Sequence, residues 1–239
     1  MPEKSGLQFT SSLTKKEYIA ALAYLPVHVI GIPSLVAVLV FGVSDLLTLN
    51  IIAYSVGTVY MLALLGKFLR RDFDALCDHP VKFIVEIGVS YGIYYLSNFV
   101  IALILTAADS LSNPNNGAVI DMALESGRQM VIMTVVMAPI VEELMFRAGV
   151  FGLLRKYNRV AAYAASMILF SVYHIWAYAI SDASYWIYVI QYLPVAFLLC
   201  RCYERCNSIW GSIGLHMLVN GMSMWALNAL SNLCARPMS

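Results

Sequence analysis

The sequence predicts an all-α membrane protein, a polytopic bundle of about seven to eight transmembrane helices. Of its 239 residues, 61% are hydrophobic and only 12% are charged, whereas soluble domains carry about 25% charged residues. The mean hydropathy is +0.75, and the apolar residues gather into runs close to the length of about 20 residues that crosses a bilayer. We therefore expect one membrane domain over residues 1–239, and these values exclude an ordinary cytosolic enzyme.

Seven charge-poor runs in the sequence are the predicted membrane spans. The first run follows Lys15 and Lys16 and is too long for the hydrophobic part of a cleaved signal peptide, so we expect a retained signal anchor. The segment 107–128 lies between the third and fourth runs, and an eighth, interfacial helix is expected there. The runs are 18–41, 46–66, 83–106, 130–154, 160–180, 185–200 and 208–229.

The charges predict the orientation and limit the partners. With loops alternating between the two sides, most basic residues fall on one side, which the positive-inside rule makes cytoplasmic, together with the N-terminus. The other side carries Arg128 and Arg236 and the acidic residues Asp45, Asp109, Asp121, Glu125 and Asp182. Because 15 Lys and Arg balance 14 Asp and Glu, nucleic acid is not an expected partner. The cytoplasmic set is Lys4, Lys15, Lys16, Lys67, Arg70, Arg71, Lys82, Arg155, Lys156, Arg159, Arg201 and Arg205.

Few ionisable residues remain inside the spans, and each is a candidate functional residue because it costs about 3 kcal/mol or more in hydrocarbon. Glu86, near the inner end of the third span, is interpreted as an interfacial partner of Lys82. His28 has no polar neighbour one turn away on its own helix and is interpreted as a packing residue. The others are Glu142, Glu143 and Arg147 in the fourth span, His174 in the fifth and His216 in the seventh.

The fourth span is predicted to hold one paired and one free carboxylate. Glu143 and Arg147 are four residues apart and share a helix face, so they can form an ion pair. Glu142 points about 100° away from Glu143 and stays available for chemistry. Pro139 has no N–H to donate to the carbonyl of Val135, which indicates a wet cavity beside Glu142.

Three helices are predicted to bring their polar residues to one depth. Counted at about 1.5 Å per residue from the nearest cytoplasmic basic residue, Glu143, His174 and His216 lie about 18, 22 and 16 Å deep. Phe170 shares a face with His174, and Asn220 shares one with His216. Packing gives no reason for this match in depth, so it indicates a common site.

Two kinds of hydrolytic chemistry fit these side chains. An imidazole beside a carboxylate can hold and deprotonate a water molecule, and His and Asn donors can stabilise an oxyanion. Two His and one Glu are also a ligand set for catalytic zinc with an open fourth position. If the site needs a metal such as Zn²⁺, its ligands would be Glu142, His174 and His216; the residues alone leave metal dependence open.

The motifs resemble those of one protein family. The motifs follow one another on the fourth, fifth and seventh predicted spans, as Glu142-Glu143-x-x-x-Arg147, Phe170-x-x-x-His174 and His216-x-x-x-Asn220. In this combination the chain resembles the CPBP family of intramembrane proteases, which includes type II CAAX prenyl endopeptidases and bacterial proteins for bacteriocin processing and immunity. The resemblance covers residues 130–222 as a catalytic core, while residues 1–129 form helices without an assigned motif.

The resemblance implies an enzyme, a glutamate or metallo-endopeptidase of the membrane with a polar cavity open to the cytoplasmic side. Its substrate would be a prenylated CAAX peptide or a small hydrophobic peptide held in the bilayer. It implies that Glu142 activates water with His174, that His216 and Asn220 form the oxyanion hole, and that Glu143, Arg147 and Phe170 organise the site.

Alternative functions use the same cavity. A non-catalytic immunity or scaffold protein would bind a membrane peptide there, and a proton or cation transporter could also use Glu and His in the membrane. Other intramembrane proteases are excluded because the chain has no H-E-x-x-H, no G-x-S-x-G-like serine turn and no paired intramembrane Asp. The short chain and minimal loops favour a prokaryotic plasma membrane.

Overall fold

The computed structural model describes residues 9–31, 46–107 and 113–234, and these residues form a helical membrane bundle, as the sequence predicts. Five helical runs in this part of the chain are long and apolar enough to cross a membrane: Leu47–Asp78, Pro80–Ala107, Gly127–Arg155, Arg159–Ser181 and Ala183–Cys206. Outside the described residues lie the predicted span residues 32–41 and the loop charges Lys4, Asp45, Asp109 and Arg236. The described part of the first predicted span is helical, as α1 (Lys15–Pro26) and the π-helix η1 (Val27–Gly31).

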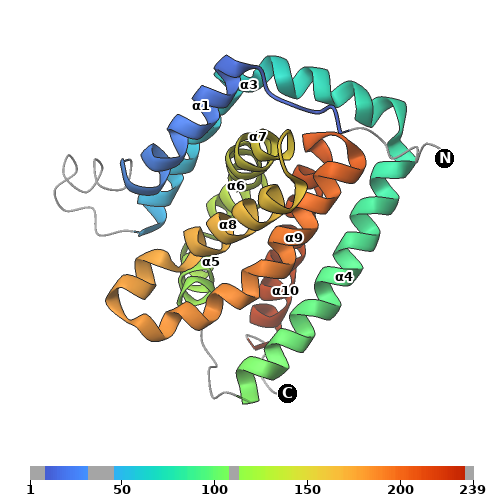
Figure 1. The fold of residues 1–239 in the computed structure, drawn as a ribbon. Coiled ribbons are helices and arrows are strands. Elements are labelled where there is room, and N and C mark those ends of the chain that lie inside the picture. The colour runs from blue at the N-terminus through green and yellow to red at the C-terminus, as the bar shows by residue number, and fades with distance from the viewer. Residues whose placement is uncertain (1–8, 32–45, 108–112, 235–239) are drawn as a thin grey trace.

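The second and third predicted spans are longer than the sequence suggests. Helix α3 (Leu46–Asp78) passes the predicted end at residue 66, because Phe68, Leu69 and Asp72 continue its buried stripe while the other face carries exposed basic residues. In Figure 1, α3 rises beside α1, crosses the top of the bundle and leads into α4 (Pro80–Ala107), which descends along the edge. The extension of α3 is therefore an amphipathic cap on that end.

The fourth predicted span is one continuous helical run of mixed type, and it occupies the centre of the bundle (Figure 1). The extra helix expected near 107–128 is α5 (Pro114–Val131), which begins at the cap residue Asn113 and leads directly into that run. The run continues through the π-helix η2 (Ile132–Met137), α6 (Ala138–Glu143), the π-helix η3 (Leu144–Phe151) and α7 (Gly152–Arg155). Such π-helical turns are rare in proteins, and those that occur are often found at functional sites.

The last three predicted spans are helical and pack around the central run. They are α8 (Arg159–Ser181), the 3₁₀ turn η4 (Ala183–Tyr188) with α9 (Val189–Cys206), and α10 (Ile209–Cys234). The 26 residues of α10 are long enough to cross a membrane. This helix is not among the five apolar runs, because His216, Asn220 and several serines lower its hydropathy.

Basic residues from separate loops meet at one end of the bundle, as their predicted common side requires. Arg155 and Arg159 both bind Glu204, at 2.6 and 2.7 Å. Glu86 binds Arg205 at 2.6 Å and Arg201 at 3.1 Å. The predicted pairing of Glu86 with Lys82 is therefore wrong, because Glu86 is buried against α9, and the end of α9 supplies both arginines.

A short connection at the same end ties the N-terminal segment to the α9–α10 turn. Asn207 ends α9 in the left-handed conformation, with φ of 53°, which Asn tolerates better than most residues. Its side-chain oxygen accepts hydrogen bonds from the backbone N–H groups of Thr10 and Ser11, at 2.7 and 3.1 Å. Ser11 also donates to the buried carboxylate of Asp72 in α3, at 2.7 Å. Three distant parts of the chain are joined there.

Candidate active site

The predicted ion pair of the central run forms in the interior of the bundle. Arg147 Nη1 lies 3.1 Å from Glu143 Oε1, and both side chains are fully buried. The guanidinium group lies over the ring of Phe170, 4.1 Å from its centroid, a distance at which a cation is attracted by the ring. Its Nη2 donates to the carbonyl oxygen of Ala196 at 3.4 Å. The charge of Arg147 is thus compensated from three helical segments.

Glu143 has a second partner that the helix pattern did not predict. His216 Nδ1, on α10, lies 2.8 Å from the same Glu143 Oε1. A carboxylate accepts hydrogen bonds, so this contact assigns the proton to Nδ1 and fixes the direction of the ring. The opposite nitrogen, His216 Nε2, then faces Glu142, 3.9 Å from Oε2.

His174 on α8 is oriented in a similar way by a backbone group. Its Nδ1 lies 2.8 Å from the carbonyl oxygen of Phe170, which can only accept, so Nδ1 donates. The ring stacks on Tyr192 with 4.5 Å between centroids and contacts Phe170 at the same distance. His174 Nε2 therefore points to Glu142, also 3.9 Å from Oε2.

The two oxygens of Glu142 have different surroundings. Oε1 accepts a hydrogen bond of 2.6 Å from Tyr54 of α3, whereas Oε2 has no hydrogen-bond partner among the described residues and faces both histidines. A separation of 3.9 Å is too long for a direct hydrogen bond and suits one bridging water molecule. The structure thus brings Glu142, His174 and His216 together around Oε2.

Asn220 lies one turn beyond His216 but makes a different contact from the others. Its Nδ2 donates to the carbonyl oxygen of Thr134 at 2.8 Å. Thr134 precedes Pro139 by five residues, within a π-helix in which Ala138 N–H bonds to Met133, also five residues back. The carbonyl five residues before Pro139 in this π-helical pattern is that of Thr134, and Asn220 supplies the donor that Pro139 lacks. The predicted acceptor, the carbonyl of Val135, is the one that a regular α-helix would leave without a donor.

Three residues near the site were missed or misjudged in the sequence. Tyr54 and Tyr173 share a hydrogen bond of 2.9 Å between hydroxyl groups, and His28 Nε2 lies 3.2 Å from the hydroxyl of Tyr173. His28 was interpreted as a packing residue because it has no polar neighbour one turn away on its own helix, whereas its polar contact lies on α8. Counted at about 1.5 Å per residue from Lys16, His28 lies about 18 Å deep, and this match to the depth of Glu143 was a usable signal.

The donor set suits zinc in chemistry but not in arrangement. A Glu oxygen and two imidazole nitrogens are common zinc ligands, and both Nε2 atoms face Glu142 Oε2. Yet within residues 9–31, 46–107 and 113–234, no group of three or more His, Cys, Asp or Glu side chains is placed so that it could hold a metal ion.

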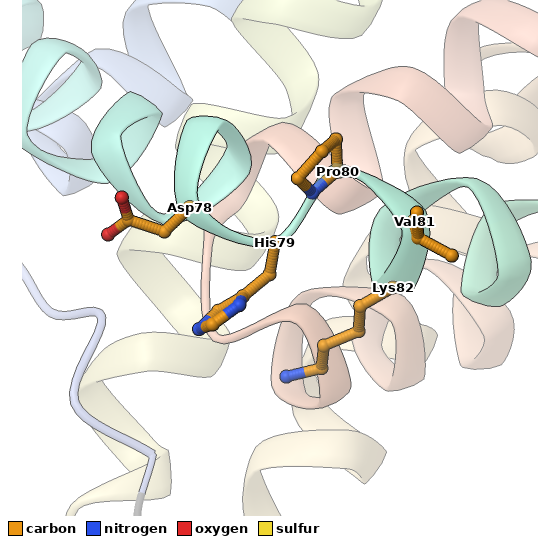
Figure 2. A pocket seen from close by; sticks show the side chains of 5 residues that line it. All are labelled: Asp78, His79, Pro80, Val81 and Lys82. Atoms are coloured by element: carbon orange, nitrogen blue, oxygen red, sulfur yellow. The ribbon is translucent and has the colours of Figure 1, made fainter.

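A surface pocket of about 470 Å³ lies at the turn between α3 and α4, away from the Glu142 group. It is lined by five consecutive residues, Asp78, His79, Pro80, Val81 and Lys82. Figure 2 shows the His79 and Lys82 side chains pointing into the same space. None of the five belongs to the predicted motifs, so the pocket has no part in the candidate site.

Comparison with known proteins identifies the segment that carries the motifs. Residues 126–222 match the family model described as "Type II CAAX prenyl endopeptidase Rce1-like", and this range includes every motif residue from Glu142 to Asn220. By this match, residues 126–222 are similar to the type II CAAX prenyl endopeptidases, in line with the resemblance to CPBP proteases that the motifs carry. The CPBP motifs thus coincide with the side chains that meet at Glu142.

One curated relative is named as a membrane peptidase. Over 107 residues the chain is 28% identical to a protein of Bacillus subtilis (strain 168) named "Putative membrane peptidase YdiL". The aligned part covers 44% of this chain and 40% of the Bacillus protein, so the chain spans less than half the length of this relative. No solved structure matches the chain.

Proposed function

We propose that the chain is an intramembrane endopeptidase that hydrolyses a peptide bond of a membrane-associated peptide, either a prenylated CAAX peptide or a small hydrophobic one. The observation that carries the proposal is the arrangement at Glu142 Oε2, which faces His174 Nε2 and His216 Nε2 at 3.9 Å each. A buried carboxylate oxygen between two oriented imidazoles is a place to hold and deprotonate water.

The reaction uses one water molecule and returns the base to its initial state. Glu142 Oε2 takes one proton from the water, and His174 Nε2 accepts a hydrogen bond from the O–H group that remains. The hydroxide attacks the peptide carbonyl carbon, and the carbonyl oxygen becomes an oxyanion. When the tetrahedral intermediate collapses, the C–N bond breaks, and the proton on Glu142 passes to the leaving amine.

Oxyanion stabilisation is assigned to His216 and Asn220. His216 Nδ1 is held by Glu143, so donation from Nε2 requires protons on both ring nitrogens, that is, an imidazolium ion. Glu143 and Glu142 would then flank this cation on two sides. Asn220 Nδ2 has one hydrogen on the carbonyl of Thr134 and keeps a second amide hydrogen for the oxyanion.

The proposal is tested with the purified protein in lipid vesicles. A farnesylated CAAX peptide and the same peptide without the prenyl group are offered as substrates, and products are identified by mass spectrometry. We expect cleavage by the wild type and a loss of about 10²- to 10⁴-fold in Glu142→Ala, with an unchanged melting temperature of the folded variant. Repeating the assay with a chelator reports any need for a metal.

Two results would overturn the proposal. Full cleavage by Glu142→Ala would show that Glu142 is not the general base. Peptide binding that is equal in the wild type, Glu142→Ala and His174→Ala, with no cleavage by any of them, would favour the non-catalytic immunity or scaffold alternative.

A further inference from the structure

A chain of hydrogen bonds leads from the N-terminal helix to Glu142. His28 Nε2 lies 3.2 Å from the hydroxyl of Tyr173, this hydroxyl lies 2.9 Å from that of Tyr54, and Tyr54 lies 2.6 Å from Glu142 Oε1. His28 is 4% exposed, and its ring also packs against the rings of Tyr54 and Tyr24. The four members come from η1, α8, α3 and α6.

The donor count gives this chain one direction when Glu142 is ionised. A carboxylate only accepts, so the single hydroxyl hydrogen of Tyr54 is directed at Glu142. Tyr173 must then donate its hydrogen to the oxygen of Tyr54. The oxygen of Tyr173 is left as an acceptor for the N–H at His28 Nε2. Each member therefore aligns the next one.

This direction fixes which oxygen of Glu142 does the chemistry. With Oε1 held by Tyr54, the carboxylate cannot rotate freely, and Oε2 stays between the two histidines. The remaining charged or titratable neighbours, Glu143 and Arg147, belong to the same helical run and bind each other. The chain from His28 thus reaches Glu142 through Oε1, whereas His174 and His216 face Oε2.

We propose that His28, Tyr173 and Tyr54 form a positioning relay that holds the Glu142 carboxylate in its reactive orientation. The relay rests on the proposed function for its effect on catalysis, but its hydrogen bonds exist in the folded protein without substrate. Its first and third members, His28 and Tyr54, lie outside the family-matched residues 126–222. The N-terminal helices, which carry no motif, therefore take part in organising the site.

The relay predicts a specific kinetic signature. Tyr54→Phe removes a hydrogen bond to a charged acceptor, so kcat should fall about 10- to 100-fold while KM stays the same. His28→Leu should lower kcat by about 3- to 10-fold, because the neutral hydrogen bond that it removes is weaker. His28→Gln keeps an N–H donor and should restore most of the activity.

A double-mutant cycle separates a relay from independent packing effects. If His28 acts through Tyr54, then His28→Leu should cause no further loss in the Tyr54→Phe background. Tyr60→Phe is the matched control, because Tyr60 lies on the same helix and donates to the carbonyl of Ala20, outside the relay. Additive losses in the double mutant, or an equal loss in Tyr60→Phe, would overturn the relay.

An infrared measurement tests the relay without any assay of cleavage. The carboxylate band of Glu142 is identified as the one that Glu142→Gln removes, and it should shift in Tyr54→Phe and in Tyr173→Phe but not in Tyr60→Phe. A shifted band in a protein that cleaves nothing would leave the relay standing and reject the proposed function. An unshifted band together with wild-type kcat in Tyr54→Phe would reject the relay alone.

Discussion

The central run Gly127–Arg155 and helix α4 have the same mean hydropathy, 1.6, but opposite surroundings. In the most apolar stretch of each, 56% of the residues are buried in the central run and 11% in α4. Hydropathy therefore reports that both segments belong in a membrane and not which one faces protein. The difference shows that the placement of charged residues predicts which span is buried better than hydropathy does, because the other helices surround the run that holds the buried ion pair.

The largest contrast is expected for two buried carboxylates that each hold two basic groups. Glu143 binds Arg147 and His216, whereas Glu86 of α4 binds two arginines near the end of the bundle. Glu143→Gln should lower kcat about 10²- to 10⁴-fold, because His216 loses the charged acceptor that orients it. Glu86→Gln should keep kcat near that of the wild type. Equal losses in a cleavage assay would contradict the comparison.

The same contrast should appear in stability when an arginine is removed. Arg147→Met leaves Glu143 buried with His216 as its only remaining basic partner, and breaking a buried pair costs about 3–5 kcal/mol. The side chain of Arg205 is 57% exposed, and an exposed pair contributes about 1 kcal/mol or less. Thermal unfolding in detergent should show a large drop in melting temperature for Arg147→Met and a small one for Arg205→Met. A larger drop for Arg205→Met would refute this reading.

Leucine truncations compare packing against protein with packing against lipid. Leu144 is fully buried in the central run, whereas Leu96 on α4 is 67% exposed. Leu144→Ala leaves a cavity and should lower the free energy of unfolding by about 2 kcal/mol. This is the lower end of the range for protein cores, because lipid and the protein interior are both apolar and the loss comes mainly from the cavity. Leu96→Ala should change stability by less than about 0.5 kcal/mol. The measurement is again the melting temperature, and similar shifts for both variants would weaken the comparison.

The smallest expected effects come from two glycines. A Cβ on Gly57 would lie 2.7 Å from the hydroxyl of Tyr24 and 3.2 Å from Val141 of the central run, whereas no described atom lies within 4 Å of a Cβ on Gly92 in α4. Gly57→Ala should destabilise by about 1 kcal/mol or more, and Gly92→Ala should stabilise by a few tenths up to about 1 kcal/mol. Opposite signs in the unfolding midpoint are the outcome that supports the comparison.

Much of the fold and the centre of the site could be predicted because their signals are local. Charge-poor runs locate helices, and Glu143 with Arg147 follows from a spacing of four residues. Depth counting placed Glu143, the neighbour of Glu142, level with His174 and His216, since each helix rises regularly through the membrane.

The rest depended on contacts between helices, which spacing does not reveal. Tyr54 and Tyr173 lie in apolar runs where a tyrosine has no pattern of its own, and His28 was judged by neighbours on its own helix. The partner of Asn220 was missed because π-helical turns cannot be seen in hydrophobic periodicity. The pairing of Glu86 followed from the burial of α4 against α9 and not from the nearest lysine in the sequence.

The contact of Asn207 with Thr10 and Ser11 also orders events during synthesis. Thr10 and Ser11 precede Asn207 by 197 and 196 residues, so the N-terminal segment leaves the ribosome long before the turn that binds it exists. The N-terminal segment can therefore be tied to the α9–α10 turn only after residue 207 has been made, and a nascent chain that is stalled before this residue would lack the contact.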